Sequence, residues 1–241
     1  MRQASVKAFG CVIFPHSIHK PHINPPIQDQ PFFATSYRVN VTTNSQLDVD
    51  PAASAQATLD YLTNQTGPLE SSASNWVGWE KLPPPFRRAL SNTTLATLST
   101  FPPDWPELEL LPLAYNTAPP VDTDNYATFS VAVLTPTSRG NVTIASVDAD
   151  HNPIVSPNWL TTKADQELAV QALKRIRDVA KASGITVGPE VAPGANVTSN
   201  AQLLAYIKET LVPIYHAVAT CRLSFACRKG YLDMEMLGLV Y

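Results

Sequence analysis

The chain has 241 residues, of which 44% are hydrophobic and 15% charged, and its formal net charge is −3. That hydrophobic share excludes a disordered chain, and the sparse charge without a Lys/Arg cluster excludes a nucleic-acid-binding surface. Proline outnumbers glycine by 22 to 9, and no two glycines are separated by a single residue. The sequence therefore lacks a Gly-x-Gly-x-x-Gly dinucleotide fingerprint, a Walker A loop and a Gly-x-Ser-x-Gly nucleophile elbow.

Two kinds of signal bear on the compartment. No apolar run of about 18 residues occurs, so the sequence predicts no membrane span, and the short stretch 8–14 lacks the cleavage pattern of a signal peptide. Asn-x-Thr sequons favour descent from a secreted glycoprotein, which leaves the compartment itself open. Their asparagines are Asn40, Asn64, Asn92, Asn141 and Asn196.

The N-terminal third begins with a Pro- and His-rich segment, 1–31, which we expect to be loop. Residues 36–43 alternate apolar and β-branched types with polar ones, a pattern that predicts a half-buried strand. Residues 51–63 predict a helix that stops at Gly67-Pro68. Its apolar side is expected to comprise Ala53, Ala57, Leu59, Tyr61 and Leu62.

Prolines divide residues 68–125 into short pieces, so we expect short helices and loops packed over a sheet. Within it, residues 108–113 are apolar enough for a strand, which Pro112 places near a sheet edge. Residues 128–134 and 141–147 predict two more strands. The Pro- and Gly-containing linker 135–140 indicates that they form an antiparallel hairpin.

Two amphipathic segments predict the longest helices. The first covers about 164–183, begins at a capping box formed by Thr162 and Asp165, and ends at Gly184. Its apolar face comprises Leu168, Ala169, Ala172, Leu173, Ile176, Val179 and Ala180.

The second helix covers about 200–211, begins at a Ser199/Gln202 capping box and ends before Pro213. Residues 214–218 then read as extended and apolar. The whole pattern predicts an α+β fold, an antiparallel sheet with helices packed on one side.

His216 is the first candidate for chemistry. A histidine can take a proton from a hydroxyl near neutral pH, which the oxidation of an alcohol requires. The alternative is a core histidine that is hydrogen-bonded to a neighbour, because the residues alone assign it no partner.

Three other candidates each have an alternative structural explanation. His16, His19 and His22 could hold a metal ion, but Pro15 and Pro21 argue against the helix that would bring them to one face. Trp76, Trp79 and Trp105 could line a pocket, although packing in a core is the more common role. Cys221 could act as a nucleophile, but no base can be assigned to it, so we treat it as a small buried residue.

Four segments follow one another in a recognisable order. They are Pro136–Gly140, Pro153–Leu160, the basic helix that starts at Ala164-Asp165-Gln166, and His216-x-x-x-Thr220-Cys221. This order resembles the C-terminal half of a glucose-methanol-choline (GMC) oxidoreductase. The segments 28–33, 36–45 and 78–82 are similar to fungal members, especially the aryl-alcohol-oxidase-like and secondary-metabolite branches. The resemblance covers about residues 27–223.

The resemblance implies an FAD-dependent enzyme that oxidises the CH–OH group of an alcohol. It implies a substrate domain built on an antiparallel sheet and a separate Rossmann-like flavin domain. His216 matches the family's active-site histidine, which faces the flavin and acts as base for the substrate hydroxyl during hydride transfer. Asn158 matches a structural position of the substrate domain.

The chain also departs from the family pattern. The family's Gln-Asp-His is Gln28-Asp29-Gln30 here, and the glycine before Thr-Cys is Ala219. We expect residues 1–26 and 224–241 to lie outside the family domain, and no cofactor-binding residue is assigned. The flavin domain is therefore expected to be missing or incomplete.

We accordingly expect a substrate-domain portion of a GMC oxidoreductase that binds FAD poorly and is inactive alone. The alternatives are a non-catalytic binding module, a degenerate gene product, and one half of a split enzyme completed by a separate flavin-domain chain. We also expect self-association, because a face that covers flavin in the parent would meet water.

Overall fold

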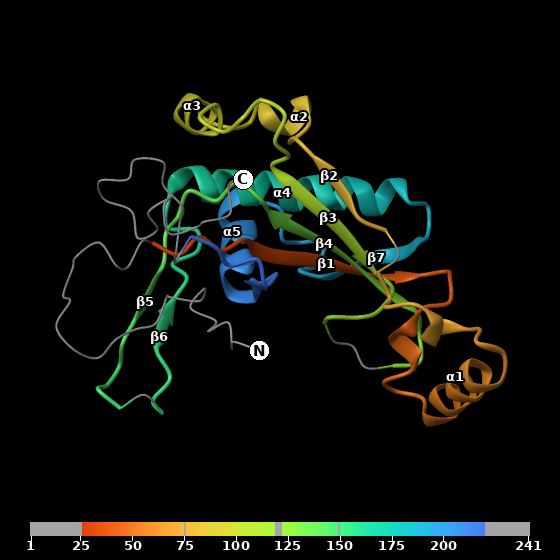
Figure 1. Cartoon of the computed structure of the whole chain (residues 1–241). Helices are drawn as coiled ribbons and strands as arrows, with labels where there is room; N and C mark the ends of the chain where they lie inside the picture. Colours follow the sequence, from red (N-terminus) through yellow and green to blue (C-terminus); the bar gives the residue numbers. More distant parts are fainter. Residues whose placement is uncertain (1–25, 75, 119–121, 149, 220–241) are drawn as a thin grey trace, which may run out of the picture. The chain divides into compact units, whose positions relative to one another are not determined.

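The structure is a computed structural model that describes residues 26–74, 76–118, 122–148 and 150–219 (Figure 1). These residues divide between two compact units. The larger consists of 30–138 and 160–215, and the smaller includes 139–159 with the flanking residues 26–29 and 216–219.

An antiparallel sheet forms the larger unit. Its strands lie in the order β2-β3-β4-β1-β7, and β8 pairs with the beginning of β1. Their bounds are β1 (Pro31–Val39), β2 (Gly78–Glu80), β3 (Leu108–Leu113), β4 (Tyr126–Val133), β7 (Thr186–Ala192) and β8 (Val212–Pro213). The α+β architecture is the one that the sequence predicts.

Helices cover one face of this sheet. The long helix α4 (Lys163–Ala182) packs against β4 and β1, and α5 (Asn200–Thr210), α2 (Pro84–Arg87) and α3 (Asn92–Leu98) pack against α4 (Figure 1). All the predicted apolar residues of α4 are buried except Val179, which is half-buried. Periodicity therefore predicted both the helix and the side that faces the sheet.

The pairing register assigns each strand residue to one face. Phe33, Val131 and Leu110 lie in one cross-strand row on the α4 face. The adjacent row, on the opposite face, contains Trp79, Glu109, Ala132 and Phe32. We call this opposite face the open face, because it is the side away from α4.

The N-terminus of α4 differs from the predicted capping box in one arm. The Thr162 hydroxyl accepts the backbone N–H of Asp165 at 3.2 Å, as expected. The Asp165 carboxylate instead accepts the backbone N–H groups of Thr137 at 2.8 Å and Ser138 at 2.7 Å. The second predicted hydrogen bond of the box, from the backbone N–H of Thr162 to the Asp165 carboxylate, was wrong. The amides of Thr137 and Ser138 bind that carboxylate instead.

The second capping box is confirmed. The Ser199 hydroxyl accepts the N–H of Gln202 at 3.2 Å, and the Gln202 side chain accepts the N–H of Ser199 at 3.1 Å. The segment after α5 is not continuously extended, because Tyr215 adopts a left-handed φ of 63° and is 90% exposed.

The predicted hairpin of 128–134 with 141–147 is wrong. β4 pairs with β1 and β3, whereas the shorter strand β5 (Asn141–Thr143) pairs with β6 (Ile154–Ser156) in the smaller unit. The linker does not turn back, because Asp165 and the amides of Thr161 and Thr162 hold Thr137 and Ser138 along α4.

Other boundaries differ in smaller ways. β1 starts at Pro31 and ends at Val39, earlier at both ends than the predicted strand 36–43. β3 is interior rather than at the edge, but β2 flanks it only over Leu108–Leu110, so Pro112 lies where one side of β3 has no strand neighbour.

Helix α1 (Pro51–Asn64) matches the prediction in extent but not in burial. Only Ala57 is buried, while Leu59 and Leu62 are 57% and 75% exposed. Its start is fixed locally, since the Asp50 carboxylate caps Ala52 and Ala53. Two 3-10 turns complete the elements, at Asn44–Gln46 and Pro68–Glu70. Among the described residues, no helix is long and apolar enough to cross a membrane.

Candidate functional site

His216 lies in the smaller unit on an exposed stretch of chain. Two residues later, Val218 pairs with Gln28 through two backbone hydrogen bonds of 2.8 and 2.9 Å. This antiparallel bridge fixes the backbone beside the histidine. It also brings Gln28 together with the stretch His216–Ala219, and these come from opposite ends of the described chain.

Gly140 joins these segments to the β5–β6 hairpin. Its N–H donates to the carbonyl of Ile27 at 2.8 Å. A Cβ at this position would lie on the Ser156 carbonyl oxygen, 2.6 Å from Ile27 Cγ2 and 2.7 Å from the carbonyl carbon of Pro157. Only glycine fits here, so two of the segments that carry the resemblance, Pro136–Gly140 and Pro153–Leu160, meet at one close backbone contact beside Ile27.

Asn158 stabilises the same hairpin. Its side-chain amide donates to the carbonyl of Arg139 at 3.2 Å, and its oxygen accepts the Ser156 hydroxyl at 2.9 Å. Its left-handed φ of 51° is one that asparagine tolerates better than most residues. These contacts support the structural role that the resemblance implies for it.

The open face of the larger unit carries a second group of polar residues. Glu109 is only 8% exposed, yet its carboxylate forms no hydrogen bond or ion pair with the described residues. Ser130, its diagonal neighbour on β4, is fully buried, and its hydroxyl also has no partner. A buried hydroxyl is costly without a partner, so Ser130, with the unpaired Glu109 carboxylate near it, can receive a ligand or another part of the protein.

The neighbouring hydroxyls on this face are satisfied. Thr128 accepts the N–H of Thr117 at 3.2 Å and donates to the carbonyl of Tyr115 at 2.9 Å. Ser36 lies 3.0 Å from the Thr128 hydroxyl. The turn at 115–117 therefore closes this end of the open face and leaves the end near Glu109 with unused polar groups.

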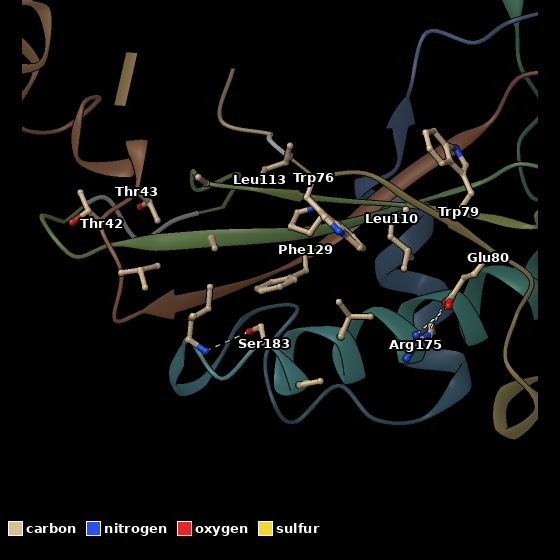
Figure 2. A pocket seen from close by; sticks show the side chains of 18 residues that line it. Thr42, Thr43, Trp76, Trp79, Glu80, Leu110, Leu113, Phe129, Arg175 and Ser183 are labelled. Atoms are coloured by element: carbon tan, nitrogen blue, oxygen red, sulfur yellow. Dashed lines mark hydrogen bonds and ion pairs between the residues drawn. The ribbon is translucent and has the colours of Figure 1, made fainter. Parts of the chain in front are cut away.

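The tryptophans do not fill the core. Trp76, Trp79 and Trp105 are 51%, 59% and 51% exposed, so the packing interpretation was wrong for all three. Trp76 lines a groove with its ring (Figure 2), as the pocket interpretation requires. Trp79 borders the same groove from β2, but its ring points to the open face. The Trp105 ring packs beside Phe101 at a centroid distance of 6.3 Å.

The charged side chains near α4 are structural. Glu107, only 2% exposed as a side chain, pairs with Arg87 at 2.7 Å and accepts the N–H of Leu82. Burial tends to raise the pKa of Glu167, but hydrogen bonds from the Ser91 backbone N–H and from Thr94, Ser91 and Lys163 outweigh it and lower that pKa overall.

The described residues do not fit the adenine-dinucleotide part of FAD. That moiety needs closely spaced glycines whose N–H groups approach a pyrophosphate. Gly140 has the least room for a Cβ among the described glycines, but the atoms that close that space belong to Ser156, Pro157 and Ile27. No described glycines form such a cluster. No group of three potential metal ligands occurs among the described residues, and His16, His19, His22 and Cys221 lie outside them.

Sequence reasoning missed Glu109 and the packing role of Gly140. Glu109 stands between two leucines in Leu108-Glu-Leu110. In a sheet that is helix-covered on one side, a charge at alternate spacing marks the other side, and this signal was available. Gly140 offered no signal beyond a turn, because its contacts come from distant segments.

Comparison with known proteins identifies the family in which these features occur. A family model for GMC oxidoreductases matches residues 136–236, which include Gly140, Asn158 and His216. The chain belongs to the GMC oxidoreductase family. The matched region runs past residue 223, and the proposed domain limits remain predictions.

Two curated relatives are fungal proteins that are much longer than this chain. Patulin synthase of Penicillium expansum is 40% identical over 219 residues, which cover 86% of this chain and 35% of the relative. The GMC oxidoreductase atC of Aspergillus terreus is 43% identical over 195 residues, or 80% and 32% of the two chains. The chain therefore spans about a third of the length of these relatives.

A solved structure shares the fold. Formate oxidase of Aspergillus oryzae superposes with a TM-score of 0.71 at 18% identity, over 84% of this chain and 38% of that one. The α+β fold thus corresponds to the family's substrate-binding domain, and the match covers 38% of the solved chain.

Proposed function

We propose that this chain is the alcohol-binding part of an FAD-dependent GMC oxidoreductase of fungal secondary metabolism. His216 is the base that takes the proton of the substrate hydroxyl on an imidazole nitrogen. The observation that carries the proposal is the backbone pairing of Gln28 with Val218, because it holds the His216 segment against a second segment of the family pattern.

The open face of the larger unit, taken by itself, offers polar groups to a ligand. Glu109 can accept a hydrogen bond from a ligand hydroxyl, and Ser130 can donate one. The Ser130 hydroxyl is buried without a partner, so a ligand that pairs with it recovers a hydrogen bond that the described residues leave unmade.

The chain alone neither retains FAD nor turns over. FAD is the electron acceptor of this family's chemistry, but the described residues offer no pyrophosphate cradle for it. Either residues elsewhere in a longer chain or a separate polypeptide must hold the cofactor. Purified chain mixed with FAD and desalted is expected to show no flavin absorbance, and 4-methoxybenzyl alcohol is expected to cause no reduction.

A chimera tests the base. The matched third of Penicillium expansum patulin synthase is exchanged for this chain, and activity toward benzylic alcohols is measured per bound flavin. His216→Ala is expected to lower kcat by about 10²- to 10⁴-fold, the usual contribution of general base catalysis. His151→Ala, at an exposed histidine of the same unit, is the control.

The outcomes separate the two parts of the proposal. Flavin retained by the isolated chain would refute its incompleteness. Equal activity of the His216→Ala and His151→Ala chimeras, both with bound flavin, would refute the role of His216.

A further inference from the structure

A groove of about 660 Å³ lies between the α4 face of the sheet and the C-terminal half of α4 (Figure 2). Leu110, Pro112 and Phe129 form its sheet side, and Arg175 and Val179 line it from α4. It lies on the opposite side of the sheet from Glu109 and Ser130, so it is separate from the polar groups of the open face. Its volume is that of a small-molecule site.

Trp76 forms a wall of this groove, and its indole ring lies against Gly78. A Cβ on Gly78 would be 2.9 Å from Cη2 and 3.1 Å from Cζ2 of the indole. Only glycine therefore lets the ring lie this close to β2. Figure 2 shows the Trp76 ring above Phe129, whereas the Trp79 ring points away from Arg175. The indole stays 51% exposed, so a large aromatic surface remains available.

The charges of the groove cancel. Arg175 Nε and Nη2 donate to Glu80 Oε1 and Oε2 at 2.7 and 3.0 Å. This two-pronged bond raises the pKa of Arg175 and occupies both oxygens of the carboxylate. The pair leaves no net charge, so an ionic ligand would gain no unpaired partner here and would lose its hydration.

Hydroxyls line the other end of the groove. Thr43 is engaged with Ser45 at 2.8 Å, and Ser183 donates to the carbonyl of Ala180 at 2.6 Å. The exposed Thr42 hydroxyl has no hydrogen-bond partner among the described residues. This end can bind one polar substituent of a ligand whose body is apolar.

We propose that the groove is a second binding site, for an uncharged planar aromatic molecule that bears a hydroxyl group. The ring stacks on Trp76 over Leu110 and Phe129, and its hydroxyl points toward Thr42. The site is non-catalytic and needs no flavin, so it does not depend on the proposed function.

Calorimetric titration of the purified chain with 2-naphthol tests the site. Saturable one-to-one binding is expected, with saturation transfer between the naphthol protons and an indole. Trp76→Ala and Gly78→Ala should each weaken binding at least tenfold, the first by removing the wall and the second by displacing it. Val179→Glu is a third variant that places a charge in the groove without touching β2. Trp105→Ala removes an equally exposed indole outside the groove and should leave the affinity unchanged.

A charged probe and the oligomeric state complete the test. 2-Naphthalenesulfonate should bind at least tenfold more weakly than 2-naphthol. Absent naphthol binding, equal loss in the Trp105→Ala control, or tighter binding of the sulfonate would overturn the proposal. A dimer that dissociates on Trp76→Ala would also overturn it, because a second copy would then occupy the groove.

Discussion

The Asp165 carboxylate accepts the backbone N–H of Ser138 at 2.7 Å, so the first turn of α4 holds the last residue of the sheet unit before Arg139. The same carboxylate accepts the N–H of Thr137 at 2.8 Å and its hydroxyl at 2.7 Å. Asp165 is buried, with only 2% of the residue exposed. Its hydrogen bonds hold the linker 135–140 in a course different from the hairpin turn that the sequence predicts.

Asp165→Ala should therefore destabilise the chain strongly. Two buried amides and one hydroxyl would lose their acceptor, and we expect the free energy of unfolding in urea to fall by about 2 to 4 kcal/mol. Asp48→Asn, at an exposed aspartate, is the control and should change it by less than about 0.5 kcal/mol. Similar unfolding midpoints for the two variants would show that Asp165 does not anchor the loop.

Gly140→Ala should disrupt the smaller unit. The added methyl group would overlap the Ser156 carbonyl and crowd Ile27, so the backbone bonds of Ile27 and Gln28 must lengthen or break. Hydrogen exchange at the Gln28 and Val218 amides is expected to become faster. The comparison variant is Gly184→Ala, whose methyl meets no atom within 4 Å but keeps a left-handed φ of 71°.

That comparison separates packing from backbone strain. Gly184→Ala should cost about 1 kcal/mol of unfolding free energy from conformation alone and leave exchange at Gln28 unchanged. If Gly140→Ala behaves in the same way, the close contact with Ser156 is not what requires glycine.

Tyr126 makes stability fall at alkaline pH. Burial, followed by its hydrogen bond to Asp122 at 2.9 Å, raises its pKa from 10.0 to about 12. The folded chain thus holds this proton more tightly than the unfolded chain, and the stabilisation present below pH 10 is lost as pH rises toward 12.

Tyr126→Phe should flatten part of this alkaline decline. We expect a shallower loss of unfolding free energy between pH 10 and 12 in urea titrations, together with a lower value at pH 8 from the missing hydrogen bond. Tyr61→Phe, on an exposed side of α1, serves as control. Parallel pH profiles for wild type and Tyr126→Phe would contradict the prediction.

The open face should promote self-association. Trp79 is 59% exposed there, and the half-buried Phe32 lies in the same cross-strand row three strands away. Exposed apolar patches favour association, so the sedimentation coefficient should increase with concentration, and Trp79→Gln should reduce that increase. Trp105→Gln is the matched control, and a monomer at every concentration would disprove the expectation.

Local sequence signals predicted the helices well. The caps at Thr162 and Ser199 set the starts of α4 and α5, and the apolar periodicity of 168–180 sets the buried side of α4. Each signal acts on residues only a few positions away in the sequence. The strand partners of β4 could not be predicted in this way. They depend on β1 and β3, which are distant in sequence, and on Asp165 diverting the linker.

Burial was the other property that local signals missed. The periodicity of α1 resembles that of α4, but only Ala57 of α1 is buried. The resemblance to GMC oxidoreductases assigned His216 and Asn158 by position, while Glu109 became visible only when the register showed which side α4 covers.

The unpaired carboxylate of Glu109 has a consequence for how this chain can evolve. An acid on a residue that is only 8% exposed and has no partner among the described residues adds no ion pair to the fold, and replacing such a group with an apolar residue of similar volume is often neutral or stabilising. Glu109→Met is therefore a single step that favours the fold and removes the polar contact. A lineage released from binding its ligand would lose this glutamate early, so its presence or absence among relatives is a marker of which copies still bind one.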